Sequence, residues 1–186
     1  MNVLGHASPS PWTSREKLAR AAWLVIELTL FRWSPRPCHA WRRGLLRLFG
    51  ARILDRAGPP ARVAPSARIH FPWKLELHAG SMIGARVRIY NLAPITLQLG
   101  ANLAQDVHLC AGSHDYTRWS MPLEARPIVI GANAWLAAEV FVGPGVTIGE
   151  LAVIGARSVV MRDQPARMVC AGHPCRPLKP RPEPVA

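Results

Sequence analysis

The chain has 186 residues and a formal net charge of +12, with 23 lysines and arginines against 11 aspartates and glutamates. This length is typical of a single folded domain. The charge favours an anionic partner, but the arginines are spread from Arg15 to Arg181 and the chain contains no nucleic-acid-binding motif. We therefore expect no nucleic-acid partner.

Residues 14–31 are predicted to form a helix, with Ser14 as its N-cap. Its apolar stretch is interrupted by Glu27 and is shorter than the about 20 residues that cross a bilayer, so we expect no transmembrane segment. The chain lacks the small-residue cleavage site of a signal peptide, and its four cysteines form no Cys-x-x-Cys pair. These features favour a cytoplasmic protein with reduced thiols.

A second helix is predicted at residues 38–49, where three arginines accompany leucine, tryptophan and phenylalanine. Such a helix can lie on an anionic membrane surface, which keeps a location at the inner face of the membrane open. We prefer the alternative, in which both helices pack against the remaining chain and cover the open end of its fold.

An aliphatic residue returns at every sixth position between residues 130 and 160. The positions are Ile130, Leu136, Val142, Ile148, Ile154 and Val160. A period of six fits neither a helix nor a flat strand, and it indicates a short strand followed by a corner, repeated. Runs of the same period begin upstream at Val63, Ile83 and Leu97, with two-residue inserts between them. The chain is therefore predicted to coil into a β-solenoid, with coils stacked about 4.8 Å apart.

The repeat stops between Leu109 and Ile130, where polar, glycine, proline and aromatic residues replace the aliphatic ones. We interpret residues near 112–128 as a loop that leaves the solenoid. Loops on a rigid scaffold often carry catalytic residues, so His114 is the first candidate for chemistry. The alternative is a surface histidine without a catalytic role.

These patterns divide the chain into three parts. Residues 1–56 form a basic helical region, residues 57–175 form the β-helix domain, and residues 176–186 form a C-terminal tail. The tail is rich in proline, which predicts an extended segment with little structure of its own.

Several segments of the chain resemble the hexapeptide-repeat acyltransferases. The similarity is strongest to the branch of maltose and galactoside O-acetyltransferases, and within it to the colanic acid biosynthesis acetyltransferases. The segments are IYNL at 89–92, AQDVHLCAGSHDY at 104–116, the repeats at 127–160 and AGHPCRPLK at 171–179. The resemblance implies a left-handed parallel β-helix that assembles as a homotrimer, with active sites between neighbouring subunits. It also implies acetyl transfer from acetyl-CoA to a hydroxyl of a saccharide acceptor, without a metal.

The same resemblance assigns His114 as the general base. A neutral imidazole can remove the proton of a hydroxyl as that oxygen attacks the thioester. The group that orients the ring is not identified, because a backbone carbonyl can serve. On the acceptor side, the resemblance implies Asn91, Asp115 and Tyr116. The alternatives are that Asn91 makes a turn and that Asp115 supports the loop.

The resemblance further implies a coenzyme site with small, aromatic and basic residues. These are Trp135, Ala138, Ala156, Arg162, Arg176 and Lys179. Small side chains let the pantetheine arm lie close to the coils, and Arg176 and Lys179 match the positions that meet the CoA phosphates. The alternatives are that Trp135 packs in an interface and that the basic residues belong to a solvated tail. Met161 stands where relatives carry a polar residue, so the residues that would contact the adenine are not identified.

Other functions stay open at this point. The acceptor can be a small xenobiotic hydroxyl compound, since such acetyltransferases share the scaffold. The same solenoid also occurs in zinc carbonic anhydrases, and His78, His108 and His114 are candidate ligands. The six-residue spacing of the last two differs from that family, which argues against zinc. A scaffold without catalytic activity is the remaining alternative.

Overall fold

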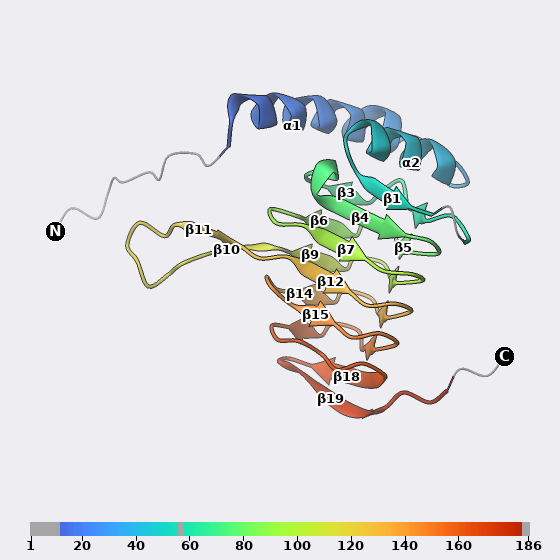
Figure 1. The fold of residues 1–186 in the computed structure, drawn as a ribbon, viewed down its shortest axis with the longest axis vertical. Coiled ribbons are helices and arrows are strands. Elements are labelled where there is room, and N and C mark those ends of the chain that lie inside the picture. Colours follow the sequence, from blue (N-terminus) through green and yellow to red (C-terminus); the bar gives the residue numbers. More distant parts are fainter. Residues whose placement is uncertain (1–11, 56–57, 184–186) are drawn as a thin grey trace.

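The computed structural model describes residues 12–55 and 58–183. A helical N-terminal region lies across one end of a solenoid, and a long hairpin projects from the side of the solenoid (Figure 1). The helical region contains α1 (Ser14–Ile26), the π-helix η1 (Glu27–Phe31) and α2 (His39–Leu48). Within the two described ranges, no helix has the length and apolar character needed to cross a membrane.

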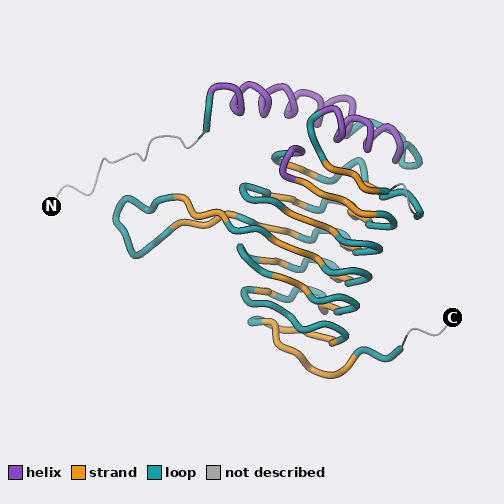
Figure 2. The backbone as a smooth tube through the Cα atoms, in the orientation of Figure 1, coloured by secondary structure: helices purple, strands orange, loops and turns teal. Residues whose placement is uncertain are grey.

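The solenoid consists of three sheets, which we name A, B and C, and the chain visits them in turn (Figure 2). Sheet A contains β1 (Arg52–Leu54), β4 (Leu75–His78), β7 (Ile95–Leu97), β12 (Ile128–Ile130) and β15 (Thr147–Ile148). Sheet B contains β2 (Arg62–Val63), β5 (Met82–Ile83), β8 (Asn102–Leu103), β13 (Trp135–Leu136), β16 (Val153–Ile154), β18 (Met168–Gly172) and β19 (Cys175–Pro180). Sheet C contains β3 (Arg68–Ile69), β6 (Arg88–Tyr90), β9 (His108–Cys110), β14 (Phe141–Val142) and β17 (Val159–Val160). A short 3-10 helix, η2 (Pro72–Lys74), precedes β4.

This winding explains the six-residue period. Ile130, Leu136 and Val142 are fully buried and lie on sheets A, B and C respectively, so each side of a coil contributes one residue to the core. Parallel pairing joins Ile130 to Ile148, one coil of eighteen positions later. The upstream strands β3 and β6 pair over twenty positions, which accounts for the two-residue inserts. The predicted parallel β-helix with an N-terminal helical appendage is confirmed.

The helices bind the free strand edges of the first coil. Trp23 Nε1 donates to the Ile69 carbonyl at 2.6 Å, and Glu27 accepts from the Ile69 N–H at 2.7 Å. The guanidinium of Arg42 is fully buried and donates to the Val63 carbonyl at 2.6 Å. Exposed edge groups would otherwise pair with another chain or with water. The preferred interpretation, that the helices cover the end of the solenoid, is confirmed.

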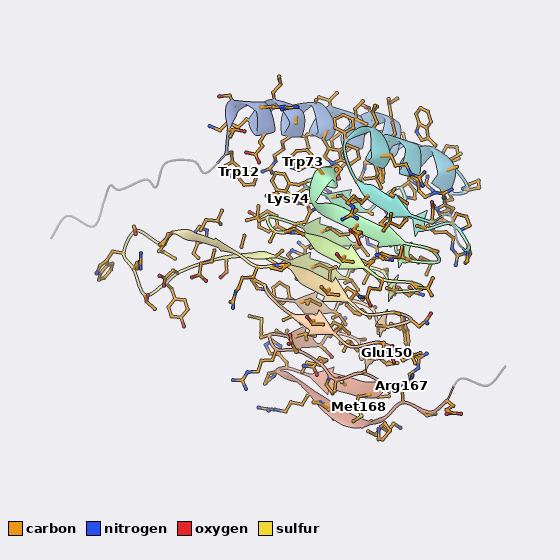
Figure 3. All side chains as sticks on the ribbon, viewed as in Figure 1. Trp12, Trp73, Lys74, Glu150, Arg167 and Met168 are labelled. Atoms are coloured by element: carbon orange, nitrogen blue, oxygen red, sulfur yellow. The ribbon has the colours of Figure 1, made fainter. Side chains whose placement is uncertain are left out.

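Aromatic packing attaches the start of α1 to the same end. Trp12 stacks on Phe71 with ring centroids 4.6 Å apart, and Trp73 meets Phe71 edge-on at 5.5 Å. Figure 3 shows Trp12, Trp73 and Lys74 gathered between α1 and the first coils, with Glu150 and Arg167 near the opposite end. At that opposite end, Arg167 forms an exposed ion pair with Glu150 at 3.1 Å.

Three predicted boundaries are corrected. The N-cap of α1 is Thr13, because its hydroxyl accepts from the Glu16 N–H while the Glu16 carboxylate accepts from the Thr13 N–H. The solenoid begins before residue 57, since β1 pairs with β4. The predicted tail contains β19, which pairs antiparallel with β18 and covers an edge of sheet B. Prolines are compatible with such an edge strand, so composition alone was misleading there.

Candidate active site

A two-stranded hairpin interrupts the solenoid between sheets C and A. Its strands are β10 (Gly112–His114) and β11 (Leu123–Ala125), and the Arg126 N–H donates to the Ala111 carbonyl at 3.0 Å to close its base. The chain leaves the solenoid at Gly112, where a Cβ would lie 2.4 Å from Leu92 Cδ1. A side chain at this exit would require Leu92 or the hairpin to move, which favours glycine here.

His114 is the last residue of β10, and it is exposed. Its Nδ1 lies 2.7 Å from the carbonyl oxygen of Met121. A carbonyl can only accept, so Nδ1 carries the proton and the neutral ring keeps a lone pair on Nε2. The partner that the sequence left unidentified is thus a backbone carbonyl, and it favours the tautomer that a general base needs.

The carbonyl of Met121 is positioned by an unusual backbone conformation. Met121 has a φ of +40°, and its N–H donates to the Arg118 carbonyl at 2.9 Å. Seven other described non-glycine residues also have a positive φ, so this conformation shapes the turn at Met121 and does not by itself mark a functional site. Sequence reasoning missed Met121, because the following Pro122 predicts an extended residue at this position.

The two residues after His114 have different surroundings. Asp115 accepts from the Thr117 N–H at 3.0 Å and lies 3.3 Å from Arg118 Nε. Hydrogen bonds from Thr117 and the charge of Arg118 lower the pKa of Asp115. Asp115 thus stabilises the loop, which was the alternative to acceptor binding. Tyr116 projects from the hairpin with 86% of its surface exposed.

Asn91 is not available for an acceptor. Its side chain is fully buried, with Oδ1 accepting from the Phe71 N–H at 3.0 Å and Nδ2 donating to the Phe71 carbonyl at 2.6 Å. Both polar atoms are used to join two neighbouring coils. These contacts argue against the predicted acceptor binding, and they give Asn91 a link between two coils instead of the local turn that was its alternative.

Three of the predicted coenzyme residues form a strip on and beside sheet B. Trp135 lies on β13 and is 45% exposed. Ala138 and Ala156 lie at the turn from sheet B to sheet C in adjacent coils, where the Arg157 N–H donates to the Ala138 carbonyl at 2.9 Å. Small side chains beside an exposed indole allow a long ligand arm to approach the backbone closely.

The basic candidates are divided between two places. Arg176 and Lys179 are exposed on β19, the edge strand of sheet B. Arg162 follows β17 at the turn from sheet C to sheet A, the turn from which the hairpin with His114 also leaves in an earlier coil. Within one protomer, the predicted base and most of the predicted coenzyme residues therefore lie on different sides of the solenoid.

The three histidines considered for zinc are not assembled in the protomer. His78 lies on sheet A with Nε2 2.8 Å from Glu76, His108 lies on sheet C, and His114 lies on the hairpin. Burial and the nearby charge of Arg88 lower the pKa of His108 to about 4. Among residues 12–55 and 58–183, no three His, Cys, Asp or Glu side chains are grouped to hold a metal ion.

Comparisons with known proteins identify the family. A family model described as bacterial transferase hexapeptide (six repeats) matches residues 127–162. The colanic acid biosynthesis acetyltransferase WcaF of Escherichia coli is 40% identical over 182 residues, which cover 98% of each chain. The galactoside O-acetyltransferase of Escherichia coli is 34% identical over 116 residues, which cover 60% of this chain and 57% of that protein.

Solved structures agree with this result. A maltose O-acetyltransferase from Clostridium difficile matches with a TM-score of 0.77 and 25% identity over 92% of both chains. A hexapeptide-repeat acetyltransferase from Vibrio cholerae, complexed with acetyl coenzyme A, has the same fold, with a TM-score of 0.79 over 94% of this chain and 93% of that one at 24% identity. Since a relative with 40% identity spans nearly the whole chain, the protein belongs to the hexapeptide-repeat acetyltransferases.

Proposed function

We propose that the protein transfers an acetyl group from acetyl-CoA to a hydroxyl of a saccharide or exopolysaccharide precursor, with His114 as general base. The observation that carries this proposal is the 2.7 Å contact between His114 Nδ1 and the Met121 carbonyl. In the neutral ring this contact places the lone pair on Nε2, and the ring is exposed, so an acceptor hydroxyl can reach it. The names of the relatives support a saccharide acceptor, since one is named for galactosides and another for colanic acid biosynthesis.

In the proposed reaction, a proton passes through His114 while the acetyl group moves from CoA to the acceptor. His114 Nε2 takes the proton of the acceptor hydroxyl as the oxygen attacks the thioester carbonyl. The carbon–sulfur bond then breaks, and the imidazolium of His114 returns the proton to the leaving thiolate. The products are an O-acetyl ester and free CoA, and the histidine ends in its starting state.

The coenzyme site of this proposal uses residues on and beside sheet B. Ala138 and Ala156 provide the backbone strip along which the pantetheine arm lies, and Trp135 forms one wall of the site. Arg176 and Lys179 are placed on an exposed edge strand, where cationic side chains can pair with the CoA phosphates.

A homotrimer in the cytoplasm completes the proposal. The base and the coenzyme strip lie on different sides of one protomer, so a site formed between neighbouring subunits would join the hairpin of one to sheet B of the next. The hairpin also exposes large apolar side chains, with Trp119 at 94% exposure. Such side chains are typical of an interface. Light scattering of the purified protein should give three times the chain mass, and a monomer with full activity would contradict the shared site.

The test of the proposed function separates binding from chemistry. Titration calorimetry with acetyl-CoA is expected to show about one site per chain for the wild type and for His114→Ala. Acetyl transfer to saccharide acceptors is expected to fall by about two to four orders of magnitude in His114→Ala, the usual contribution of a positioned base. Wild-type turnover in the variant would exclude His114 as the base. Absence of acetyl-CoA binding in both proteins would exclude the proposed reaction.

A further inference from the structure

The N-terminal helical region exposes an unusual amount of apolar surface. Eight large apolar side chains between residues 18 and 48 are exposed: Leu18, Leu24, Val25, Leu28, Leu30, Trp33, Trp41 and Leu48. Trp33 has 82% of its surface exposed. An exposed apolar patch on this scale marks a binding surface rather than an ordinary solvated face.

The outer face of α1 follows helical spacing. Leu18 and Val25 are seven positions apart, and the exposed alanines at 21 and 22 lie between them on the same face. The opposite face of the helical region already packs on the solenoid through Trp23 and Phe31, which are 1% and 0% exposed. Figure 1 shows α1 along the end of the molecule, so its outer face points away from the coils. Packing within the protomer therefore leaves the outer apolar face of α1 exposed.

Cationic side chains surround this apolar face. Of the nine lysines and arginines in residues 12–54, Arg42 is buried, Arg43 and Arg47 pair with Asp55, and Arg52 pairs with Glu76. The acidic residues of this range are Glu16 and Glu27, and five of its cationic side chains are exposed without a place in those pairs: Arg15, Lys17, Arg20, Arg32 and Arg36. Glu16 is bonded to the N-cap Thr13, and Glu27 is half-buried and accepts from the Ile69 N–H. The exposed charges are thus basic, and a partner for this face has to be both apolar and anionic.

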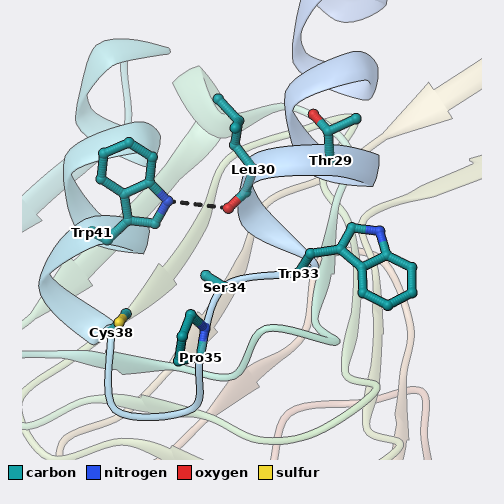
Figure 4. A pocket seen from close by; sticks show the side chains of 7 residues that line it. All are labelled: Thr29, Leu30, Trp33, Ser34, Pro35, Cys38 and Trp41. Atoms are coloured by element: carbon teal, nitrogen blue, oxygen red, sulfur yellow. Dashed lines mark hydrogen bonds between the residues drawn. The ribbon is translucent and has the colours of Figure 1, made fainter.

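A shallow apolar cavity of about 430 Å³ continues the patch between η1 and α2 (Figure 4). Trp33 and Trp41 line it, and Trp41 Nε1 donates to the Leu30 carbonyl at 3.1 Å while about half of its surface stays exposed. Indole side chains with this combination of an apolar ring and a polar edge are enriched at the boundary between lipid headgroups and acyl chains.

We propose that the outer face of α1, η1 and the start of α2 docks on an anionic lipid bilayer without crossing it. The apolar side chains enter the headgroup boundary, and the surrounding arginines contact the lipid phosphates. A second copy of the chain fits this face less well. A two-fold contact would place the same cationic surroundings against each other, and their repulsion would oppose the contact. In the homotrimer proposed above, neighbouring subunits would meet through the hairpin and sheet B instead of through this face.

Vesicle flotation with the full-length protein tests the proposal. We expect the protein to float with vesicles of phosphatidylcholine and about one third phosphatidylglycerol, and to stay in solution with phosphatidylcholine alone. Leu28→Ser should lower the partition coefficient by about tenfold, because burial of one leucine is lost. Leu99→Ser is the matched control, since Leu99 on the solenoid is 50% exposed and Leu28 is 46% exposed.

Three outcomes would overturn the proposal. The first is no flotation with the anionic vesicles, and the second is an equal loss of flotation in both leucine variants. The third is a smaller oligomer mass for Leu28→Ser than for the wild type, which would assign this face to another copy of the chain. None of these measurements depends on acetyl transfer. A negative result would therefore contradict membrane docking without contradicting the proposed function.

Discussion

Replacement of Gly112 by alanine tests whether the exit of the hairpin positions His114, the proposed general base. The added Cβ would lie 2.4 Å from Leu92 Cδ1 and 3.0 Å from Leu92 Cγ, whereas carbon atoms in contact are about 3.5–4.0 Å apart. Leu92 is only 5% exposed, so its side chain has little room to move away. We therefore expect the hairpin to shift by about 1 Å, two residues before His114, because Leu92 cannot absorb the whole overlap. A misplacement of this size lowers kcat by about 100-fold.

The assay is the release of CoA from acetyl-CoA in the presence of a saccharide acceptor, together with urea unfolding. We expect Gly112→Ala to unfold cooperatively, with a loss of about 1–3 kcal/mol in the free energy of unfolding. The double variant Gly112→Ala with Leu92→Ala should recover most of the lost kcat, because the remaining Leu92 Cβ would be 3.4 Å away. Gly44→Ala is the control, since no atom lies within 4 Å of the added Cβ. Equal kcat values for Gly112→Ala and the wild type, or no recovery in the double variant, would refute this reasoning.

Two further predictions concern the coenzyme and pH. Arg176→Ala is expected to raise the KM for acetyl-CoA by about tenfold with little change in kcat, as measured by steady-state kinetics; a lower kcat at unchanged KM would exclude Arg176 from the phosphate site. The lowered pKa of His108, about 4 against 6.5 in the unfolded chain, means that only the unfolded state takes up a proton as the pH falls from 7 to 5. Stability should therefore decrease over this range by about 1 kcal/mol after allowance for partial exposure, and His108→Gln should remove that part of the pH dependence in urea titrations. An unchanged pH dependence in His108→Gln would show that His108 is not its source.

Much of the scaffold could be predicted because it repeats. Ile130, Leu136 and Val142 each point into the same core, so the period of their spacing directly reports the length of one side of a coil. Local composition was less informative at the ends of the chain. The prolines near Pro177 suggested an unstructured tail, yet β19 pairs with β18 because an open sheet edge favours a covering strand.

The site was only partly predictable, because residue type does not reveal which backbone or side-chain groups are in contact. His114 stands out as a histidine in a loop that interrupts the repeat, but its partner is a backbone carbonyl, which every residue possesses. Asn91 shows the reverse problem. Its type and position suggested acceptor binding, and only the tertiary structure reveals that both of its polar atoms are bonded to Phe71 one coil away.

The sequence alone determined the solenoid, the hairpin loop and the candidate base, because each depends on residues close together in the chain. The tertiary structure decided the tautomer of His114, the separation of the proposed base from the proposed coenzyme residues within one protomer, and the outward apolar face of α1. These features depend on contacts between distant coils and on which side of a helix is already packed. The spacing of residue types along the sequence does not determine such contacts, so these features could not be predicted from it.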